Sequence, residues 1–270
     1  MKALISLLTD FGISDPFVAE MKAVIFSICP GVTVVDISHT VEKFNIRGGA
    51  FVLSSATPYF PSGTVHVAVV DPGVGSERRP IALETNRSLF VGPDNGLLIL
   101  AAAREGIRHV YELTNRSLMA EAISSTFHGR DIFASVAAHL ASGTPPREAG
   151  PEITDYVKLL FAEPEFNRRG VNCEILYIDG FGNIVTNISR KRLAKLNPNR
   201  GLALRNRGRH LPMRFVKTYS ELCEKELGCL VGSHGFIEIV YRQESAARRL
   251  NARIGDDLHL TVLLGTTENS

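Results

Sequence analysis

Hydrophobic and polar residues alternate along the first half of the chain in blocks typical of buried strands and amphipathic helices. The continuous apolar run at residues 3–9 stops at Asp10, as expected of a strand that is buried on both faces. Residues 15–31 then carry apolar side chains at helical spacing. Asp15 is suited to cap this helix, and Pro16 is suited to be its first residue.

The same alternation continues as far as residue 143. It predicts strands at 32–38 and 64–71, a hairpin at 80–96, and helices at 46–61, 97–106 and 131–143. Strands that alternate with helices in this way indicate an α/β fold built on a mostly parallel sheet.

The pattern changes in the second half of the chain. Residues 151–170 are rich in Pro, Glu and Arg, lack helical periodicity and are typical of a linker. From Val171 onward, short alternating runs are separated by glycine turns, which predicts a small β-barrel or sandwich. We therefore expect an α/β domain at 1–150, a linker at 151–170 and a smaller β domain at 171–270.

Composition narrows the classes of partner. The chain has 270 residues and a net charge of +2, so it lacks the field that would favour nucleic acid or an anionic membrane. No apolar run approaches membrane-spanning length, and the N-terminal segment is not typical of a signal peptide. These features predict a cytoplasmic protein that acts on a small molecule.

The four cysteines indicate neither a disulfide framework nor a metal site. They form no C-x-x-C pair, and the spacing of Cys223, Cys229 and His234 matches no standard zinc pattern. We therefore expect reduced thiols and no bound metal.

Aspartates recur where the predicted strands end. Asp10, Asp36, Asp71 and Asp94 all lie at or close to such ends. Ligands of open α/β sheets bind beyond the carboxyl ends of the strands, so some of these side chains are expected to face one cleft. Asp71 belongs to the stretch VVDPGVGSERRP at 69–80, which taken alone is an ordinary glycine-rich turn.

Four separated motifs are more informative than any of them singly: LLTDFG at 7–12, VVDPGVGSERR at 69–79, STFHGRDIF at 125–133 and YIDGFGNIVTNI at 177–188. With these motifs the chain resembles the S-adenosyl-L-methionine hydroxide adenosyltransferases, relatives of the enzymes that make fluorinated or chlorinated adenosine. The resemblance covers nearly the whole chain and implies an N-terminal α/β domain followed by a C-terminal β domain. It also implies hydrolysis of S-adenosyl-L-methionine to adenosine and L-methionine, with no cofactor.

The resemblance assigns three residues to the attacking water: Asp71, Arg78 and His128. Arg79 is the neighbouring alternative to Arg78. In the implied reaction, water or hydroxide attacks C5′ of the ribose and expels methionine as a neutral thioether. A carboxylate and an imidazole can accept hydrogen bonds from that water, and a guanidinium can hold the carboxylate ionised. Which of Asp71 and His128 takes the proton is left open.

The resemblance also assigns substrate-binding residues in both domains. Asp10 matches a carboxylate that holds both ribose hydroxyls, and its alternative role is to cap the following helix. Tyr59 and Phe127 match positions beside the sugar, and Phe44 is a further aromatic near it. The C-terminal candidates for adenine and methionine are Asp179, Phe181, Asn183, Ser233 and Glu238, with Phe181 stacking on the base and Asn183 reading its edge. Without the resemblance, these last residues would be read as parts of ordinary hairpins.

Two departures from the halogenating relatives favour water over halide. Those relatives carry an insertion after the third strand that this chain lacks, and Gly129 stands where they place a halide-contacting serine. The neighbouring Arg130 and Asp131 are expected to form an ion pair at the start of a helix. The family further implies a homotrimer, in which the α/β domain of one subunit and the β domain of the next share each site.

Two other functions remain as alternatives. A metal-dependent hydrolase could use Asp10, Asp71, Asp94 and His128 as ligands. A protein that binds S-adenosylmethionine or adenosine without turnover would need no residues that activate water.

Overall fold

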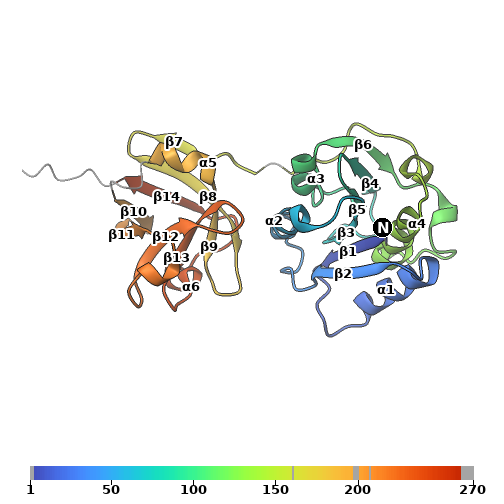
Figure 1. Ribbon diagram of the computed structural model, residues 1–270, viewed down its shortest axis with the longest axis horizontal. Helices are drawn as coiled ribbons and strands as arrows, with labels where there is room; N and C mark the ends of the chain where they lie inside the picture. The colour runs from blue at the N-terminus through green and yellow to red at the C-terminus, as the bar shows by residue number, and fades with distance from the viewer. Residues whose placement is uncertain (1–2, 160, 197–200, 207, 263–270) are drawn as a thin grey trace, which may run out of the picture. The chain divides into compact units, whose positions relative to one another are not determined.

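The computed structural model describes residues 3–159, 161–196, 201–206 and 208–262 (Figure 1). The chain divides into two compact units, residues 1–159 and 160–270. Residues 263–270 of the predicted β domain lie outside the described residues. Each unit has its own sheet and its own core.

The N-terminal unit is built on a six-stranded sheet, counted over the described residues, in the order β2-β1-β3-β5-β4-β6. Strands β1, β2, β3 and β5 run parallel to their neighbours in this group, whereas β4 is antiparallel to both β5 and β6. The prediction of a mostly parallel sheet with one hairpin is confirmed. The strands are β1 (Leu4–Thr9), β2 (Thr33–Ser38), β3 (Val65–Val69), β4 (Pro80–Thr85), β5 (Leu89–Pro93) and β6 (Ile107–Glu112).

Helices cover both faces of this sheet, with α1 and α4 on one face and α2 and α3 on the other (Figure 1). They are α1 (Phe17–Ile28), α2 (Ile46–Ala56), α3 (Ile99–Glu105) and α4 (Ser135–Ala141). The predicted start of α1 is wrong by one residue. Pro16 itself takes the N-cap position, where it has no side chain that could accept a hydrogen bond, and Asp15 does not cap the helix.

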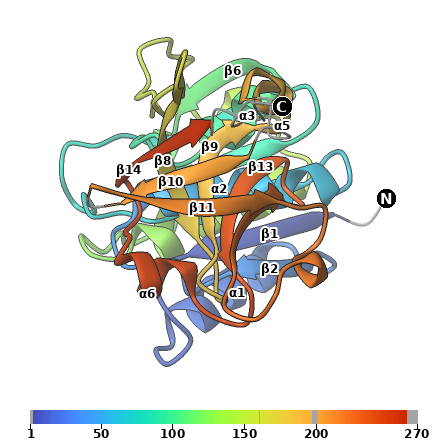
Figure 2. The same cartoon turned by 90° about the vertical axis from the view of Figure 1, so that its left-hand side faces the viewer.

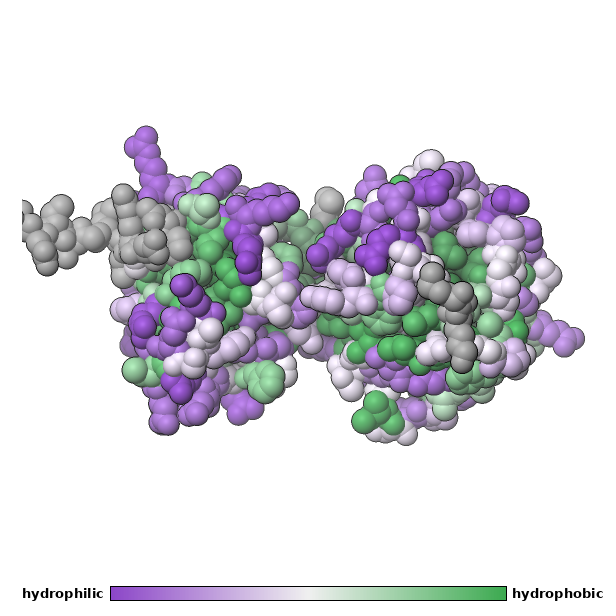
Figure 3. Space-filling view, in the orientation of Figure 1, coloured by the Kyte–Doolittle hydropathy of each residue, from purple (hydrophilic) through white to green (hydrophobic). Residues whose placement is uncertain are grey.

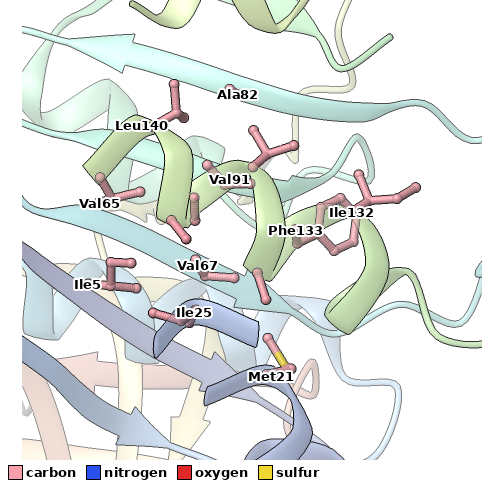
Figure 4. Packing of buried hydrophobic residues seen from close by; sticks show 14 of the residues in the cluster. Ile5, Met21, Ile25, Val65, Val67, Ala82, Val91, Ile132, Phe133 and Leu140 are labelled. Atoms are coloured by element: carbon pink, nitrogen blue, oxygen red, sulfur yellow. The ribbon is translucent and has the colours of Figure 1, made fainter. Parts of the chain in front are cut away.

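The main core of this unit lies between the sheet and the face covered by α1 and α4 (Figure 4). Aliphatic side chains of the parallel strands meet the apolar stripes of both helices there, and their burial stabilises the layer by about 25 cal/mol for each Å² removed from water. The fully or nearly buried members include Ile5, Leu7, Val65, Val67, Val91, Met21, Ile25, Phe133, Val136 and Leu140.

Among the described residues of the C-terminal unit, seven strands close into a barrel in the order β14-β10-β11-β12-β13-β9-β8, with β8 pairing back to β14 (Figure 2). Strands β11 and β12 are parallel and the other pairs are antiparallel. The barrel form of the predicted β domain is thereby confirmed. Its strands are β8 (Gly170–Ile178), β9 (Ile184–Ser189), β10 (Leu202–Asn206), β11 (Arg209–Phe215), β12 (Leu227–Val231), β13 (Phe236–Tyr241) and β14 (Asp257–Val262).

Smaller elements decorate the barrel. Strand β7 (Glu165–Asn167) pairs with β8, and two short helices, α5 (Arg190–Leu193) and α6 (Ala246–Leu250), follow β9 and β13. The interior is filled by aliphatic residues from alternate strand positions, among them Val171, Ile175, Ile184, Leu204, Ile239 and Leu260.

The segment expected to be a linker begins on the surface of the N-terminal unit. Glu152 forms a β-bridge with Tyr111, and the carbonyl of Asp155 accepts a hydrogen bond from Arg79 Nη2 at 2.8 Å. The division between the two units, after Leu159, falls inside residues 151–170.

The surface of each unit mixes hydrophilic residues with smaller hydrophobic areas (Figure 3). No helix in the described part of the chain has the length and the apolar character needed to cross a membrane.

Candidate active site

A paired carboxylate and guanidinium lie at the carboxyl end of β3. Asp71 comes just after this strand, and the loop that follows returns so that Arg78 stands just before β4. Arg78 Nε donates to Oδ1 and Oδ2 of Asp71 at 2.9 and 3.0 Å, and Arg78 Nη2 donates to Oδ2. The side chains of Asp71 and Arg78 are only 5% and 10% exposed. Such charge-assisted, two-pronged bonds fix both the position and the orientation of the carboxylate.

Gly75 lets this loop reach the segment that carries His128. Its φ of +77° lies in the left-handed region, and a Cβ there would be 2.4 Å from the carbonyl oxygen of Ser125. Both conditions require glycine. Where the loop approaches this segment, Arg78 Nη2 lies 2.9 Å from His128 Nδ1. The three residues predicted to act on the water are thus joined by hydrogen bonds, with Arg78 between the other two.

His128 stands directly before a π-helix, η3 (Gly129–Ala134), which continues into α4. Turns of π-helix are rare and occur frequently at functional sites. Asp131 fixes the segment before the helix, because its carboxylate accepts hydrogen bonds from Ser124 N at 2.8 Å and from Arg130 Nε at 2.6 Å. The predicted ion pair between Arg130 and Asp131 is confirmed.

Burial lowers the pKa of His128, and the positive charge of Arg78 lowers it further. The carboxylates of Asp71 and Asp131 act in the opposite direction without reversing the shift. With a pKa below the ordinary value of about 6.5, the imidazole is mainly neutral at pH 7.

Asp71 and His128 line a small pocket of about 110 Å³. Because a water molecule occupies about 30 Å³ in the liquid, this pocket has room for a few waters. Sites for drug-sized ligands have volumes of about 300–1,000 Å³, so this pocket can hold only one end of such a molecule. Its other lining residues are Phe11, Phe17, Val69, Val74, Thr126, Phe127 and Gly129.

Three phenylalanines form an apolar wall of this pocket. The rings of Phe11, Phe17 and Phe127 contact one another edge to face, with centroids 5.2 to 5.8 Å apart. Gly129 packs against two of these rings, and a Cβ there would lie 3.2 Å from both Phe11 Cζ and Phe127 Cε2. Any side chain at position 129 would therefore require the rings to shift.

Asp10 follows β1 and is buried. Its Oδ2 accepts a hydrogen bond from the backbone N–H of Phe44 at 2.9 Å, and its carbonyl accepts one from Lys43 Nζ. The alternative role of Asp10 as a helix cap is wrong, because α1 begins at Phe17 without any side-chain cap. Phe44 adopts a φ of +64°, which is unusual for a bulky residue.

The three aromatics predicted near the sugar differ in their environment. Phe127 is buried and lines the small pocket. Phe44 and Tyr59 are largely exposed, with Tyr59 at 77%, and in the described part of the chain neither belongs to that pocket. Exposed aromatic side chains of this size are available to contact a ligand or a partner.

Two of the four strand-end aspartates are engaged elsewhere. Asp36 lies within β2 and pairs with Lys22 Nζ at 2.6 Å. Asp94 is buried, pairs with Arg79 Nη2 at 2.9 Å and accepts a hydrogen bond from Val157 N at 2.8 Å. Neither of these two aspartates lines the small pocket beside Asp71, and Arg79, the alternative to Arg78, pairs with a different carboxylate.

No group of three or more His, Cys, Asp or Glu side chains within the described ranges is placed to hold a metal ion. The ligand set of the metal-dependent alternative, Asp10, Asp71, Asp94 and His128, therefore forms no such group. Neither do Cys223, Cys229 and His234. All four cysteines are free, and burial raises the pKa of the Cys173 and Cys229 thiols to about 12.

In the C-terminal unit, Asp179 organises the turn between β8 and β9. Its Oδ1 accepts hydrogen bonds from Phe181 N at 2.9 Å and Asn183 N at 2.8 Å, and its Oδ2 accepts one from Asn183 Nδ2 at 2.9 Å. The turn holds Asn183 buried and leaves Phe181 83% exposed. These three residues line an open pocket of about 1190 Å³.

Glu238 lies on β13, where Tyr219, a residue that lines this pocket, donates a hydrogen bond from its OH to Glu238 Oε2 at 2.8 Å. Burial raises the pKa of Glu238, and it also raises the pKa of Tyr219. Gly232 leaves the space for this carboxylate, since a Cβ there would lie 1.7 Å from Glu238 Oε1. Ser233 is exposed in the following turn and is not among the described residues that line the pocket.

Sequence reasoning missed several residues of the large pocket. They come from a 3₁₀ turn, from the last residue of β13, from the loop after it and from α6, which pattern alone does not connect with the turn at Asp179. They are Tyr219, Ser220, Tyr241, Arg242, Gln243, Glu244, Ser245, Arg248 and Arg249.

Comparisons with known proteins cover both units. The model of the SAM hydroxide adenosyltransferase N-terminal domain matches residues 5–150, and the model of the C-terminal domain matches residues 173–259. The chain is similar to the (R)-S-adenosyl-L-methionine hydrolase of Salinispora tropica, with 41% identity over 95% of this chain and 97% of that protein. The protein of the same name from Salinispora arenicola is 38% identical, with coverage of 95% and 97%.

A solved structure is also similar over the full length. An uncharacterized conserved protein from Thermotoga maritima superimposes with a TM-score of 0.90 at 36% identity, covering 95% of this chain and 99% of that chain.

Proposed function

The chain belongs to the SAM hydroxide adenosyltransferase family, and we propose on this basis that it hydrolyses S-adenosyl-L-methionine to adenosine and L-methionine. The observation that carries the proposal is Arg78, which is hydrogen-bonded to both Asp71 and His128 beside a pocket that fits water. The names of the similar hydrolases specify the (R) form of the substrate, and we extend that preference to this chain.

The proposed reaction requires the protein mainly to position the reacting groups. The sulfonium of the substrate is already a good leaving group, because it departs as a neutral thioether. The site must hold an oxygen in line behind the C5′–S bond and remove a proton as the C–O bond forms. A nearly buried carboxylate and a partly buried imidazole, fixed by one guanidinium, can do both.

Asp10 is the proposed ligand of the ribose diol. Phe44 N–H uses Oδ2 and fixes the carboxylate, which still has lone pairs for two hydroxyl groups. Phe127 lines the water pocket and is suited to border the sugar, while Tyr59 and Phe44 offer exposed rings.

The β8–β9 turn is the proposed site of the adenine and of the methionine ammonium. Phe181 presents an exposed ring for stacking on the base. Asn183 is held by Asp179 and keeps its amide oxygen and one N–H for the base edge. Asp179 offers negative charge to the ammonium, and Glu238 and Ser233 remain weaker candidates for the methionine end.

We further propose a homotrimer in which the C-terminal unit of one subunit completes the site of another. Two observations support this. The N-terminal pocket of about 110 Å³ is too small for the whole substrate, and Tyr59 and Phe181 are exposed at 77% and 83%. Native mass spectrometry should give three chains per particle, and a monomer that is fully active would contradict the proposal.

Two sequence-based expectations stay predictions. One is the cytoplasmic location. The other is turnover without a cofactor or a metal ion, which activity in the presence of a chelator would check.

The function is tested by incubating the purified chain with S-adenosyl-L-methionine of either sulfonium configuration and following adenosine and methionine by chromatography. We expect equal amounts of both products, a preference for the (R) form and no effect of chelator. Tight binding without products would favour a non-catalytic binding protein, and loss of activity in chelator would favour the metal-dependent alternative.

A further inference from the structure

The hydrogen bonds of Arg78 determine which nitrogen of His128 carries a proton. A guanidinium in a protein only donates hydrogen bonds, because it is not deprotonated and has no acceptor. Arg78 Nη2 contacts Asp71 Oδ2 and lies 2.9 Å from His128 Nδ1. Each of its two hydrogens thus has one acceptor, and His128 Nδ1 must offer a lone pair.

The other ring nitrogen of His128 must then carry the only proton of a neutral imidazole. Burial and the charge of Arg78 both lower the pKa of His128, which favours the neutral ring. A neutral imidazole with a lone pair on Nδ1 has its hydrogen on Nε2. Nε2 is therefore a donor, and it has no lone pair with which to take a proton from water.

We propose that His128 orients the attacking water as a hydrogen-bond donor through Nε2, and that Asp71 is the group that accepts the water's proton. Both residues line the same small pocket, so one water can lie between them. The inference rests on the proposed function and adds to it a division of roles between the two residues.

The step balances with no other reactant. The water oxygen forms a bond to C5′ while the C5′–S bond breaks, and the bonding electron pair moves to sulfur and cancels its positive charge. The oxygen becomes strongly acidic as it bonds to carbon, so its proton passes to an Asp71 oxygen and then to solvent. A carboxylate has about four lone-pair sites, and Arg78 approaches it only with Nε and Nη2, which leaves room for the water.

The reverse assignment conflicts with the geometry. If His128 were the base, Nε2 would need a lone pair and Nδ1 would carry the hydrogen. That hydrogen would then face the N–H of Arg78 Nη2 across 2.9 Å, which places two donors against each other.

A pair of variants at one position separates donor from base. His128→Gln places an amide N–H near the former Nε2 but cannot take up a proton, and His128→Ala provides neither. We expect His128→Gln to keep turnover within about tenfold of the unchanged protein and His128→Ala to lose a hundredfold or more, in the range of general acid–base effects. Equal loss in both variants, with unchanged melting temperatures, would overturn the inference.

The pH profile gives a second readout. The charged groups that act on His128 are Arg78, Asp71 and Asp131. Because the pKa of His128 is lowered, turnover should be constant above that pKa and fall as the pH drops through it, since a protonated Nδ1 would oppose Arg78. The midpoint of this acid limb should change in His128→Gln, because the contribution of His128 is then lost. An unchanged midpoint in that variant would contradict the assignment to His128.

A measurement without any variant or substrate tests the tautomer directly. ¹⁵N NMR of the histidine-labelled full chain at pH 7 should show a non-protonated Nδ1 and a protonated Nε2 for His128, identified by the signals lost in His128→Ala. The opposite tautomer, or an imidazolium, would overturn the inference. Because this readout is independent of turnover, it stays distinguishable from a failure of the proposed function itself.

Discussion

The two units differ in how completely they organise their candidate residues. In the N-terminal unit, Asp71 and Arg78 are almost buried and bonded to each other, beside a pocket of about 110 Å³. In the C-terminal unit, Phe181 is 83% exposed beside an open pocket of about 1190 Å³. The contrast suits a division of labour, in which the first unit sets the geometry of the reaction and the second contributes mainly to affinity.

Substitution of Asp71 should lower turnover more than any other change. It tests most directly whether the N-terminal unit sets the geometry of the reaction. Asp71→Asn keeps the shape of the side chain but removes the charge that pairs with Arg78, and with it the proposed acceptor of the proton. We expect turnover to fall by about a hundredfold or more while substrate affinity changes only several-fold. Single-turnover kinetics and calorimetric binding on the same samples check this.

The matched control is Asp36→Asn, because Asp36 is an aspartate of the same sheet that pairs with Lys22 away from the pocket. It should retain normal turnover. If Asp71→Asn behaved like this control, Asp71 would only close a turn.

Asp10→Ala should weaken binding more than it slows the reaction, because the ribose diol is held before the transition state is reached. Hydrogen bonds to a charged group contribute about 1.5–3 kcal/mol, so the affinity should fall by about tenfold to a hundredfold. Asp10→Asn can still accept from Phe44 N–H and should lose less. A fall in turnover at saturating substrate that exceeds the change in affinity would argue against this role.

Phe181→Ala tests whether the C-terminal unit contributes mainly to substrate affinity. Stacking of a base on an aromatic ring contributes about 1–3 kcal/mol, so we expect affinity to fall by about tenfold with little change in turnover. Because Phe181 is exposed, the melting temperature should stay nearly constant. Phe181→Tyr should restore binding, and an unaltered affinity in Phe181→Ala would remove the turn from the proposed site.

The smallest expected effect is that of halide ions, which should not change the identity of the product. A Cβ at position 129 would lie 3.2 Å from both Phe11 and Phe127, so a side chain there that could contact a halide would require these rings to shift. Turnover at high chloride concentration should yield adenosine, as analysed by chromatography with mass detection. Formation of 5′-chloroadenosine as the main product would contradict the preference for water.

The sequence was most informative where local pattern and tertiary structure agree. Asp71 and Arg78 are seven positions apart in one loop, so their pairing depends on local chain geometry, and Gly75 explains how that loop reaches His128. Alternation of short strands predicted a β domain, but it could not separate a barrel from a sandwich. That distinction depends on the pairing of β14 with β8, which lie far apart in the chain.

The failures also have physical causes. Asp94 satisfied the rule for strand ends, yet Arg79 and the backbone of Val157 occupy its carboxylate. Asp15 was expected to cap α1, but Pro16 takes that position. Tyr219 could not be connected with Glu238 from the sequence, because their hydrogen bond depends on how the barrel brings a 3₁₀ turn next to β13.

The central claim is that water enters at C5′ of the ribose while sulfur departs. It is tested most directly by a turnover in water enriched in ¹⁸O, followed by mass spectrometry of the adenosine. The account predicts one heavy oxygen, located on the 5′-hydroxyl group, and unlabelled methionine. Adenosine without the label, or label found in methionine, would contradict it.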